Sequence, residues 1–284
     1  MSDQKIKLYE FAGSCWANAP KIALEELGFT KDKDVEWISV NLAEGKNFDP
    51  EYLKINPAGT VPTLIAEGKT FSDSISSVQE IIKLAPHPPR ADAHTSTSII
   101  EEIHAQAHDP NATLLFAIND EDREAKSNGL PKGFLAGRQK ELDKLAQDPP
   151  NEFKDFLLKK QTDNKQLLEF FTTEPDDATR QAHYDQGQQL WKSVGIALRG
   201  VVTQALQKNG GPFAGGAEPS EVDYHLITWL SRTITNTGVE PGSPASVAMP
   251  KLQEYTGGHN LDPIIGKYWD AWVKRDSFIN LGIH

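Results

Sequence analysis

The first 85 residues alternate short β-rich runs with helix-like runs, and this alternation constrains the fold more than any other feature. Strand-like runs cover residues 6–11, 35–42, 61–66 and 69–71, and helix-like runs cover residues 19–28, 50–54 and 74–84. The order β-α-β-α-β-β-α places a right-handed βαβ crossover before two antiparallel strands. It predicts a thioredoxin-like α/β domain over residues 1–85.

Almost all of the remaining chain favours helix. Three prolines in residues 86–94 indicate a linker. Apolar periodicity or helix-forming composition follows in residues 95–117, 133–147, 151–171, 177–208, 220–234 and 264–275. Residues 236–262 are rich in glycine, proline, serine and asparagine, which indicates a loop. We therefore expect an all-α domain over residues 95–284.

Charge and composition argue against several classes of protein. Lysine and arginine number 29 against 40 acidic residues, a net charge of −11, whereas nucleic-acid binders use clusters of lysine and arginine. We find neither a long apolar run nor an apolar N-terminal segment, so we expect no membrane span and no secretory signal. The single cysteine, Cys15, cannot form an internal disulfide and fits a reducing compartment. We expect a cytoplasmic protein.

The most specific motif is Gly59-Thr60-Val61-Pro62-Thr63-Leu64, which follows Asn56-Pro57. A proline at the start of a buried strand cannot donate to the hydrogen-bond ladder. A cis bond between Val61 and Pro62 would turn the chain sharply and leave the Val61 N–H and C=O facing outward. An extended peptide could then pair with this short edge. The alternative is a trans proline on an edge strand.

A second motif, Phe71-Ser72-Asp73-Ser74, opens the helix-like run 74–84. Ser74 is well placed to cap this helix, and the free N–H groups of a first helical turn favour a carboxylate ligand. Asp73 could pair with an ammonium group beside it. A γ-glutamyl group carries both charges on one carbon and is matched to this arrangement. Plain capping by Ser74 is the alternative.

These motifs together resemble the glutathione transferase superfamily. The shared segments are the Ser14-Cys15 turn, Leu24-Glu25-Glu26-Leu27-Gly28, Asn56-Pro57, Val61-Pro62, Asp73-Ser74, the loop Pro212-Phe213-Ala214-Gly215-Gly216, and Pro219-Ser220-Glu221-Val222-Asp223. The last is interpreted as a structural capping box in which Ser220 and Asp223 satisfy each other's backbone donors.

The resemblance implies that glutathione is the co-substrate and lies along the first domain. Its cysteinyl backbone would pair beside Val61 and Pro62, and Asp73 and Ser74 would hold its γ-glutamyl end. Lys46 or Asn47 would meet its glycyl carboxylate. The resemblance also implies a homodimer.

The candidate catalytic position is the turn Gly13-Ser14-Cys15-Trp16. The resemblance places Ser14 where serine- or cysteine-type members carry their active residue, and a hydroxyl donating to the glutathione sulfur would favour thiolate. A register shift of one residue would make Cys15 the catalytic group, because a cysteine at a helix N-terminus can have a low pKa. A small buried hydrophobe is the third interpretation of Cys15.

Three residues are candidates for the acceptor pocket: Trp16, His108 and Phe116. Core or inter-domain packing is the alternative for both Trp16 and Phe116. His104 and His108 have i, i+4 spacing, which can bind zinc, but no third ligand is evident and we expect no metal. The acidic run Asp120-Glu121-Asp122 is interpreted as a solvated loop.

Residues 119–176 exceed what the core helical domain of the superfamily needs, as in extended, fungal-type members. We expect this segment to wall one side of the acceptor site. Three functions follow: conjugation of glutathione to small hydrophobic electrophiles through Ser14; a glutathione-dependent thiol transferase, reductase or ether-cleaving activity through Cys15 or Ser14; or a non-enzymatic ligand-binding relative.

Overall fold

The computed structural model describes residues 5–87 and 97–283. Four strands form one mixed sheet in the order β2-β1-β3-β4; they are β1 (Ile6–Glu10), β2 (Val35–Ser39), β3 (Thr63–Ala66) and β4 (Lys69–Phe71). β1 pairs in parallel with β2 and antiparallel with β3, and β3 pairs antiparallel with β4. Burial alternates along β1, as expected for a strand with one face in a core. The predicted thioredoxin-like topology is confirmed.

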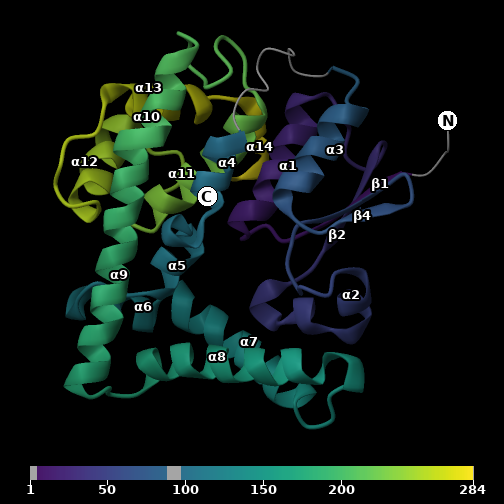
Figure 1. The fold of residues 1–284 in the computed structure, drawn as a ribbon, viewed down its shortest axis with the longest axis vertical. Helices are drawn as coiled ribbons and strands as arrows, with labels where there is room; N and C mark the ends of the chain where they lie inside the picture. Colours follow the sequence, from purple (N-terminus) through teal and green to yellow (C-terminus); the bar gives the residue numbers. More distant parts are fainter. Residues whose placement is uncertain (1–4, 88–96, 284) are drawn as a thin grey trace.

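Helix α1 (Cys15–Glu26) connects the two halves of the molecule. It contacts α3 (Ser74–Leu84) beside the sheet, and it contacts α11 (Glu221–Thr235) of the helical half (Figure 1). Both α1 and α11 are buried along most of their length, as expected of helices enclosed on several sides. The site described below therefore begins at a helix that is rigidly held.

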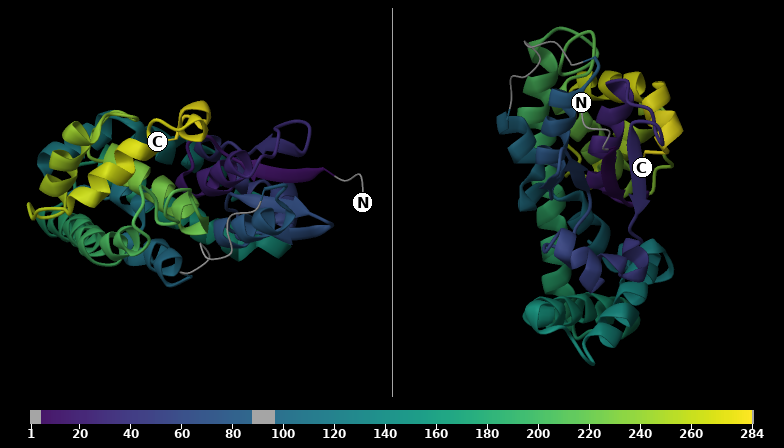
Figure 2. Two further views of the ribbon diagram at one scale, coloured as in Figure 1. Left: turned by 90° about the horizontal axis from the view of Figure 1, so that it is seen from above. Right: turned by 90° about the vertical axis from the view of Figure 1, so that its right-hand side faces the viewer.

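The remainder of the chain is helical, as predicted. Its helices are α4 (Thr97–His104), α5 (Pro110–Leu115), α6 (Asp120–Asn128), α7 (Leu130–Leu145), α8 (Lys154–Thr172), α9 (Asp177–Ala197), α10 (Thr203–Lys208), α12 (Ala245–Tyr255), α13 (Pro263–Trp272) and α14 (Asp276–Leu281). A π-helical turn over Leu198–Val202 joins α9 to α10. The short helix α2 (Pro50–Ile55) follows β2, and α7 and α8 lie beneath it as a pair (Figures 1 and 2). Among the described helices, none is long and apolar enough to span a membrane.

Three local predictions are wrong. The run 95–117 is interrupted, because α4 ends at His104 and Asp109 caps a new helix whose first residue is Pro110. The acidic run at Asp120 is not a loop but the first turn of α6, where carboxylates stabilise the helix N-terminus. Residues 236–262 contain α12, which buries Ala248 and Leu252. The expected linker falls largely on residues 88–96, outside the described residues.

The capping box at the start of α11 is confirmed. The Ser220 backbone N–H and hydroxyl both donate to Asp223 Oδ2, each at 2.8 Å, and the Asp223 side chain is completely buried. Asp223 also accepts hydrogen bonds from the backbone of Ala214 and Gly215. The box therefore fastens the 212–216 loop to α11.

Candidate functional site

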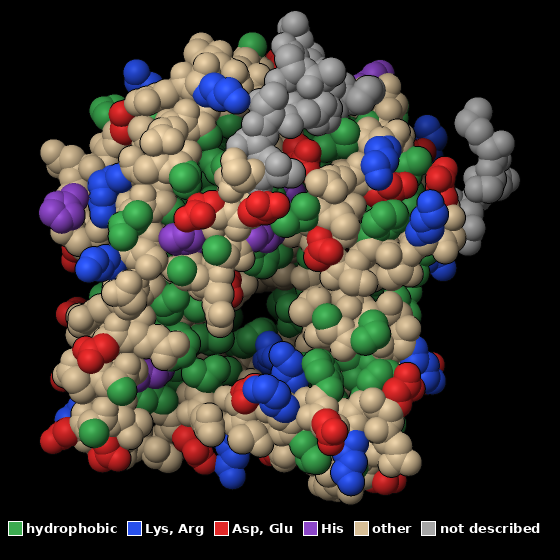
Figure 3. Space-filling view, in the orientation of Figure 1, with side chains coloured by type: hydrophobic (Ala, Val, Ile, Leu, Met, Phe, Trp, Pro, Cys, Tyr) green, Lys and Arg blue, Asp and Glu red, His purple; other side chains and the backbone are tan. Residues whose placement is uncertain are grey.

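A cavity of about 510 Å³ lies between the sheet half and helices α4, α5, α7 and α8. Figure 3 shows the molecule hollowed at its centre, with hydrophobic side chains around the hollow and Lys or Arg side chains at its lower edge. Most of the residues expected to bind ligand line this one cavity: Ser14, Trp16, Asn47, Val61, Pro62, Asp73 and Ser74. Residues far apart in sequence are thus brought to one place.

Ser14 is the N-cap of α1. Its hydroxyl oxygen accepts a hydrogen bond from the Ala17 N–H at 3.3 Å, and its side chain borders the cavity. The hydroxyl proton remains available for donation to a ligand atom. The helix N-terminus at this position favours negative charge on such an atom.

Arg232 on α11 is a cavity residue that sequence reasoning missed. Its Nη2 donates to the Gly13 carbonyl oxygen at 2.6 Å, although 219 residues separate the two. The side chain is buried, and burial lowers the pKa of Arg232. No local motif signals this residue, because only the contact between α1 and α11 brings its charge to the Ser14 turn.

Cys15 points away from the cavity into the core. Its thiol is 1% exposed and donates to the Thr228 carbonyl oxygen at 3.4 Å. Burial raises the pKa of Cys15 to about 12, even though the charge of Arg232 acts to lower it. The expectation of a low-pKa nucleophile at Cys15 is therefore wrong, because desolvation outweighs the helix N-terminus.

Asp73, rather than Ser74, caps α3. Asp73 Oδ1 accepts a hydrogen bond from the Ser76 N–H at 2.7 Å, whereas Ser74 is the first residue of the helix and is buried. The prediction of Ser74 as the cap is corrected, since Asp73 has the extended backbone of an N-cap and Ser74 already lies inside the first turn. We find no hydrogen-bond partner for Asp73 Oδ2 within residues 5–87 and 97–283. This exposed oxygen borders the cavity.

The bond between Val61 and Pro62 is cis, as the motif predicts. Buried side chains brace the chain around it. Asn56 Nδ2 donates to the Thr60 carbonyl and to Thr63 Oγ1, both at 2.9 Å, and the Tyr52 hydroxyl lies 3.0 Å from Thr63 Oγ1. The Asn56-Pro57 motif therefore has a structural role, since it shapes the segment that borders the cavity.

The two residues expected at the glycyl carboxylate are arranged differently from expectation. Lys46 does not line the cavity; its Nζ lies 3.8 Å from Glu141 Oε1 on α7. Asn47 does line the cavity, but its amide donates to the Gly59 carbonyl at 2.7 Å. The Asn47 side chain thus connects two loops of the sheet half, and Lys46 connects the sheet half to α7.

The aromatic wall of the cavity is built by Trp16. Its ring stacks on His104 with centroids 3.7 Å apart, and His104 Nε2 lies 3.1 Å from His225 Nδ1. Burial lowers the pKa of His104 to about 4 and holds the pKa of His225 well below its ordinary value of 6.5. Both imidazoles are therefore neutral at physiological pH.

Two expected pocket residues lie elsewhere. His108 Nε2 is paired with Glu102 Oε1 at 3.0 Å, and the Phe116 ring lies 4.7 Å from His183; neither borders the cavity. Because the helix is interrupted after α4, His108 and Phe116 do not reach the cavity. Leu114 and Leu115 line it instead. The same interruption removes the i, i+4 geometry of His104 and His108. Across the described residues, no group of three His, Cys, Asp or Glu side chains is arranged to hold a metal.

The long segment 119–176 borders the same cavity as Ser14. Leu130, Phe134 and Arg138 reach it from α7, and Lys160 reaches it from α8. Helix α7 touches the loop after β2 through Gly137, where an added Cβ would lie 2.1 Å from the Ala43 carbonyl oxygen. A glycine is required for so close an approach.

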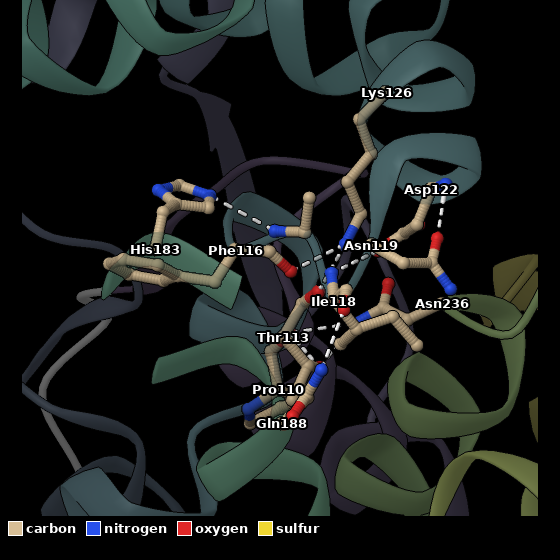
Figure 4. Close-up of polar contacts among 11 residues, drawn as sticks. Pro110, Thr113, Phe116, Ile118, Asn119, Asp122, Lys126, His183, Gln188 and Asn236 are labelled. Atoms are coloured by element: carbon tan, nitrogen blue, oxygen red, sulfur yellow. Dashed lines mark hydrogen bonds and ion pairs between the residues drawn. The ribbon is translucent and has the colours of Figure 1, made fainter. Parts of the chain in front are cut away.

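A buried lysine attaches this segment to the core. Lys126 Nζ donates to the carbonyls of Thr113 and Phe116, at 3.0 and 2.7 Å, and to Asp122 Oδ2 at 2.9 Å (Figure 4). Asp122 Oδ2 also accepts a hydrogen bond from the Ile118 N–H at 3.0 Å. Because these contacts join the end of α5 to α6, they fix the direction in which α7 leaves the core.

Comparison with known proteins gives a consistent result. The family model of the glutathione S-transferase N-terminal domain matches residues 8–89. Glutathione S-transferase Z1 of Arabidopsis thaliana is 34% identical over 146 residues, which are 47% of this chain and 64% of that protein. The match therefore spans less than two thirds of that relative's length.

Two solved structures share the whole fold. The β-etherase LigF from Sphingobium sp. strain SYK-6 has a TM-score of 0.60 and 17% identity, with 98% of this chain and 99% of that chain covered. A glutathione transferase homologue from Sulfitobacter, solved with bound glutathione, has a TM-score of 0.53 and 15% identity, with 99% of each chain covered. At these identities the likeness is one of fold.

Proposed function

We propose that this chain is a member of the glutathione transferase superfamily and that it transfers the glutathione thiolate to small hydrophobic electrophiles, with Ser14 activating the sulfur. The observation that carries this proposal is the position of Ser14 and Asp73 on one cavity, beside Val61. The curated relative at 34% identity is a glutathione S-transferase, which supports the same class of chemistry.

The proposed binding mode uses the three features of the sheet half that border the cavity. The free Asp73 Oδ2 accepts the γ-glutamyl ammonium, and the first turn of α3, at Ser74, receives the γ-glutamyl carboxylate. The cysteinyl backbone pairs with Val61, next to Pro62. The sulfur then lies at the start of α1.

The proposed chemistry begins with loss of the thiol proton to solvent. The Ser14 hydroxyl donates to the resulting thiolate, and the N-terminus of α1 and the Arg232 charge stabilise it further. The thiolate attacks an electrophilic carbon, a carbon–sulfur bond forms, and the leaving group departs with its electron pair. Trp16, Leu114 and Leu115 offer the apolar surface for the electrophile.

A redox or thiol-transfer reaction at Cys15 is disfavoured, because its thiol is buried and strongly basic. Cleavage of an ether by the same Ser14-bound thiolate stays open as an alternative acceptor chemistry, since a fold neighbour is a β-etherase. A ligand-binding protein without activity is the second alternative.

The test is a paired assay on the wild type, Ser14→Ala and Cys15→Ser. We would measure conjugation of glutathione to a chloronitrobenzene and reduction of a glutathione mixed disulfide. Loss of conjugation in Ser14→Ala and its retention in Cys15→Ser is the expected result. Disulfide reduction that disappears in Cys15→Ser would contradict the proposal, and glutathione binding with neither activity would favour the ligand-binding alternative.

The similarity to the superfamily also leads us to propose a homodimer located in the cytoplasm. Sedimentation velocity of the purified chain tests the first point, and imaging of a tagged chain in its own cell tests the second. A monomer at micromolar concentration would contradict the proposed assembly.

A further inference from the structure

The cationic residue of the loop after β2 is not available at the cavity. Lys46 is half exposed and faces Glu141 on α7, which also lies 3.7 Å from Lys144. Lys46 is absent from the cavity lining, while Asn47 uses its amide on Gly59. If the sheet half alone formed the site, this end of the cavity would offer no free positive charge.

Arg138 supplies a charge at the same end, one helical turn before Glu141. Its guanidinium carbon lies 4.9 Å from the Phe48 ring centroid and 5.0 Å from the Phe134 ring centroid. These two cation–π contacts hold the guanidinium in place, while its N–H donors can still bind an anion. Phe48 directly follows Asn47, so Arg138 is placed beside the loop in which Lys46 turns away.

Arg138 has no acidic partner among the described residues, and its buried Nε has no hydrogen-bond acceptor. Burial lowers the pKa of Arg138 to about 10, which still leaves the guanidinium charged at neutral pH. A desolvated cation without a counter-ion gains most from an entering anion.

Lys160 on α8 adds a second cation at the cavity wall. Its Nζ lies 5.4 Å from the ring centroid of Phe156, which in turn approaches Gly59 and Phe48. Burial and the nearby charge of Arg138 both lower the pKa of Lys160. The two cations therefore repel each other in the empty cavity, and an anion between them relieves this repulsion.

We propose that Arg138 and Lys160 bind the glycyl carboxylate of glutathione, so that α7 and α8 complete the tripeptide site. This inference rests on the proposed function. It gives the long helical segment 119–176 a role in binding the co-substrate. Arg138 and Lys160 then take the role at the glycyl carboxylate that the sequence analysis assigned to Lys46. The carboxylate fits the geometry, because a guanidinium edge and an ammonium can together satisfy both of its oxygens.

The experiment compares glutathione with its glycyl monoethyl ester, which keeps the γ-glutamyl and cysteinyl groups but lacks the charge. Binding to the wild-type chain is measured by calorimetry at pH 7. We expect the ester to bind roughly tenfold or more weakly, since hydrogen bonds to a charged group are lost. This arm needs no variant and is therefore independent of any effect on folding.

The second arm measures Arg138→Gln and Lys160→Gln against the matched control Lys140→Gln, an exposed lysine on α7. Each test variant is expected to weaken glutathione binding several-fold while leaving ester binding unchanged, and the control is expected to bind both as the wild type does. Circular dichroism of each variant checks that the fold is kept.

Three outcomes would overturn the inference. Equal binding of glutathione and its ester by the wild type would remove it and leave the proposed function intact. Variants that bind glutathione normally but lose activity toward a carboxylate-bearing electrophile would assign the cations to the acceptor instead. Failure of the wild type to bind glutathione at all would remove the proposed function and this inference together.

Discussion

Two helix starts in this molecule use an aspartate in opposite ways. At the start of α11, the buried Asp223 accepts hydrogen bonds from Ala214, Gly215 and Ser220, so its carboxylate has no room for a ligand. At the start of α3, the exposed Asp73 accepts one N–H from Ser76 and keeps an oxygen free at the cavity. A capping carboxylate is therefore structural or functional according to how many of its acceptor sites the protein itself fills.

The largest effect is expected at Asp223. Asp223→Ala leaves several buried donors without an acceptor, so the free energy of unfolding should fall by roughly 3 kcal/mol or more. Urea denaturation followed by circular dichroism measures this. Asp49→Ala is the control, because Asp49 caps α2 through a single N–H of Glu51 and is exposed, and its loss should cost about 1 kcal/mol. Equal losses in the two variants would contradict the comparison.

Asp73→Asn should separate binding from stability. Asparagine caps a helix about as well as aspartate, so the unfolding free energy should change by less than about 0.5 kcal/mol. Loss of the negative charge should weaken glutathione binding by roughly tenfold or more, because the γ-glutamyl ammonium loses its partner. Calorimetry of the folded variant gives the affinity. Unchanged affinity for glutathione would mean that Asp73, like Asp223, is only a structural cap.

Acidification should destabilise the core beside α11. His104 and His225 have folded-state pKa values below the ordinary 6.5, so the unfolded chain binds more protons as the pH falls. The stabilisation is then complete above pH 6.5 and declines from there down to about 4, the pKa of His104, which accounts for a loss of about 2 kcal/mol at pH 5. His225 acts in the same direction. Thermal unfolding between pH 8 and pH 5 measures this decline. A flat profile would mean that the folded-state pKa values of these imidazoles lie close to the ordinary 6.5.

The smallest effect is expected at Cys15, the buried neighbour of the cavity residue Ser14. Cys15→Ala removes a thiol that faces Thr228 and should leave the conjugation rate within about twofold of the wild type. Labelling of the native chain by a thiol reagent should also be far slower than labelling of the unfolded chain. Rapid native labelling would show that the thiol reaches solvent.

Much of the sheet half follows from local sequence. Period-2 burial in β1, the hairpin turn at Glu67-Gly68 and the Val61-Pro62 motif each depend on residues close in sequence, and the structure contains all of them. The helix α12 was missed because glycines on both sides, such as Gly242 and Gly257, suggest a continuous loop. The burial of Ala248 that stabilises this helix depends on distant segments.

The site was only partly predictable for the same reason. Whether Ser14 or Cys15 faces the cavity depends on the rotation of α1, which the packing of α1 on α11 sets and composition does not. Arg232 and Arg138 lie on α11 and α7, and each contacts a residue of the sheet half that is distant in sequence, Gly13 and Phe48 respectively. No local sequence motif marks these arginines. A single sequence therefore reveals the family-like motifs of a site more readily than the charged side chains around it.

The close approach of Gly137 to the Ala43 carbonyl has a consequence for the rate at which molecules leave the cavity. Because Gly137 has no side chain, α7 and the loop after β2 are in direct backbone contact, and separating them would break this packing. We therefore expect a ligand to enter and leave by the hollowed face seen in Figure 3 rather than between these two segments. The absence of a side chain at Gly137 is thus expected to affect how long a ligand stays in the cavity.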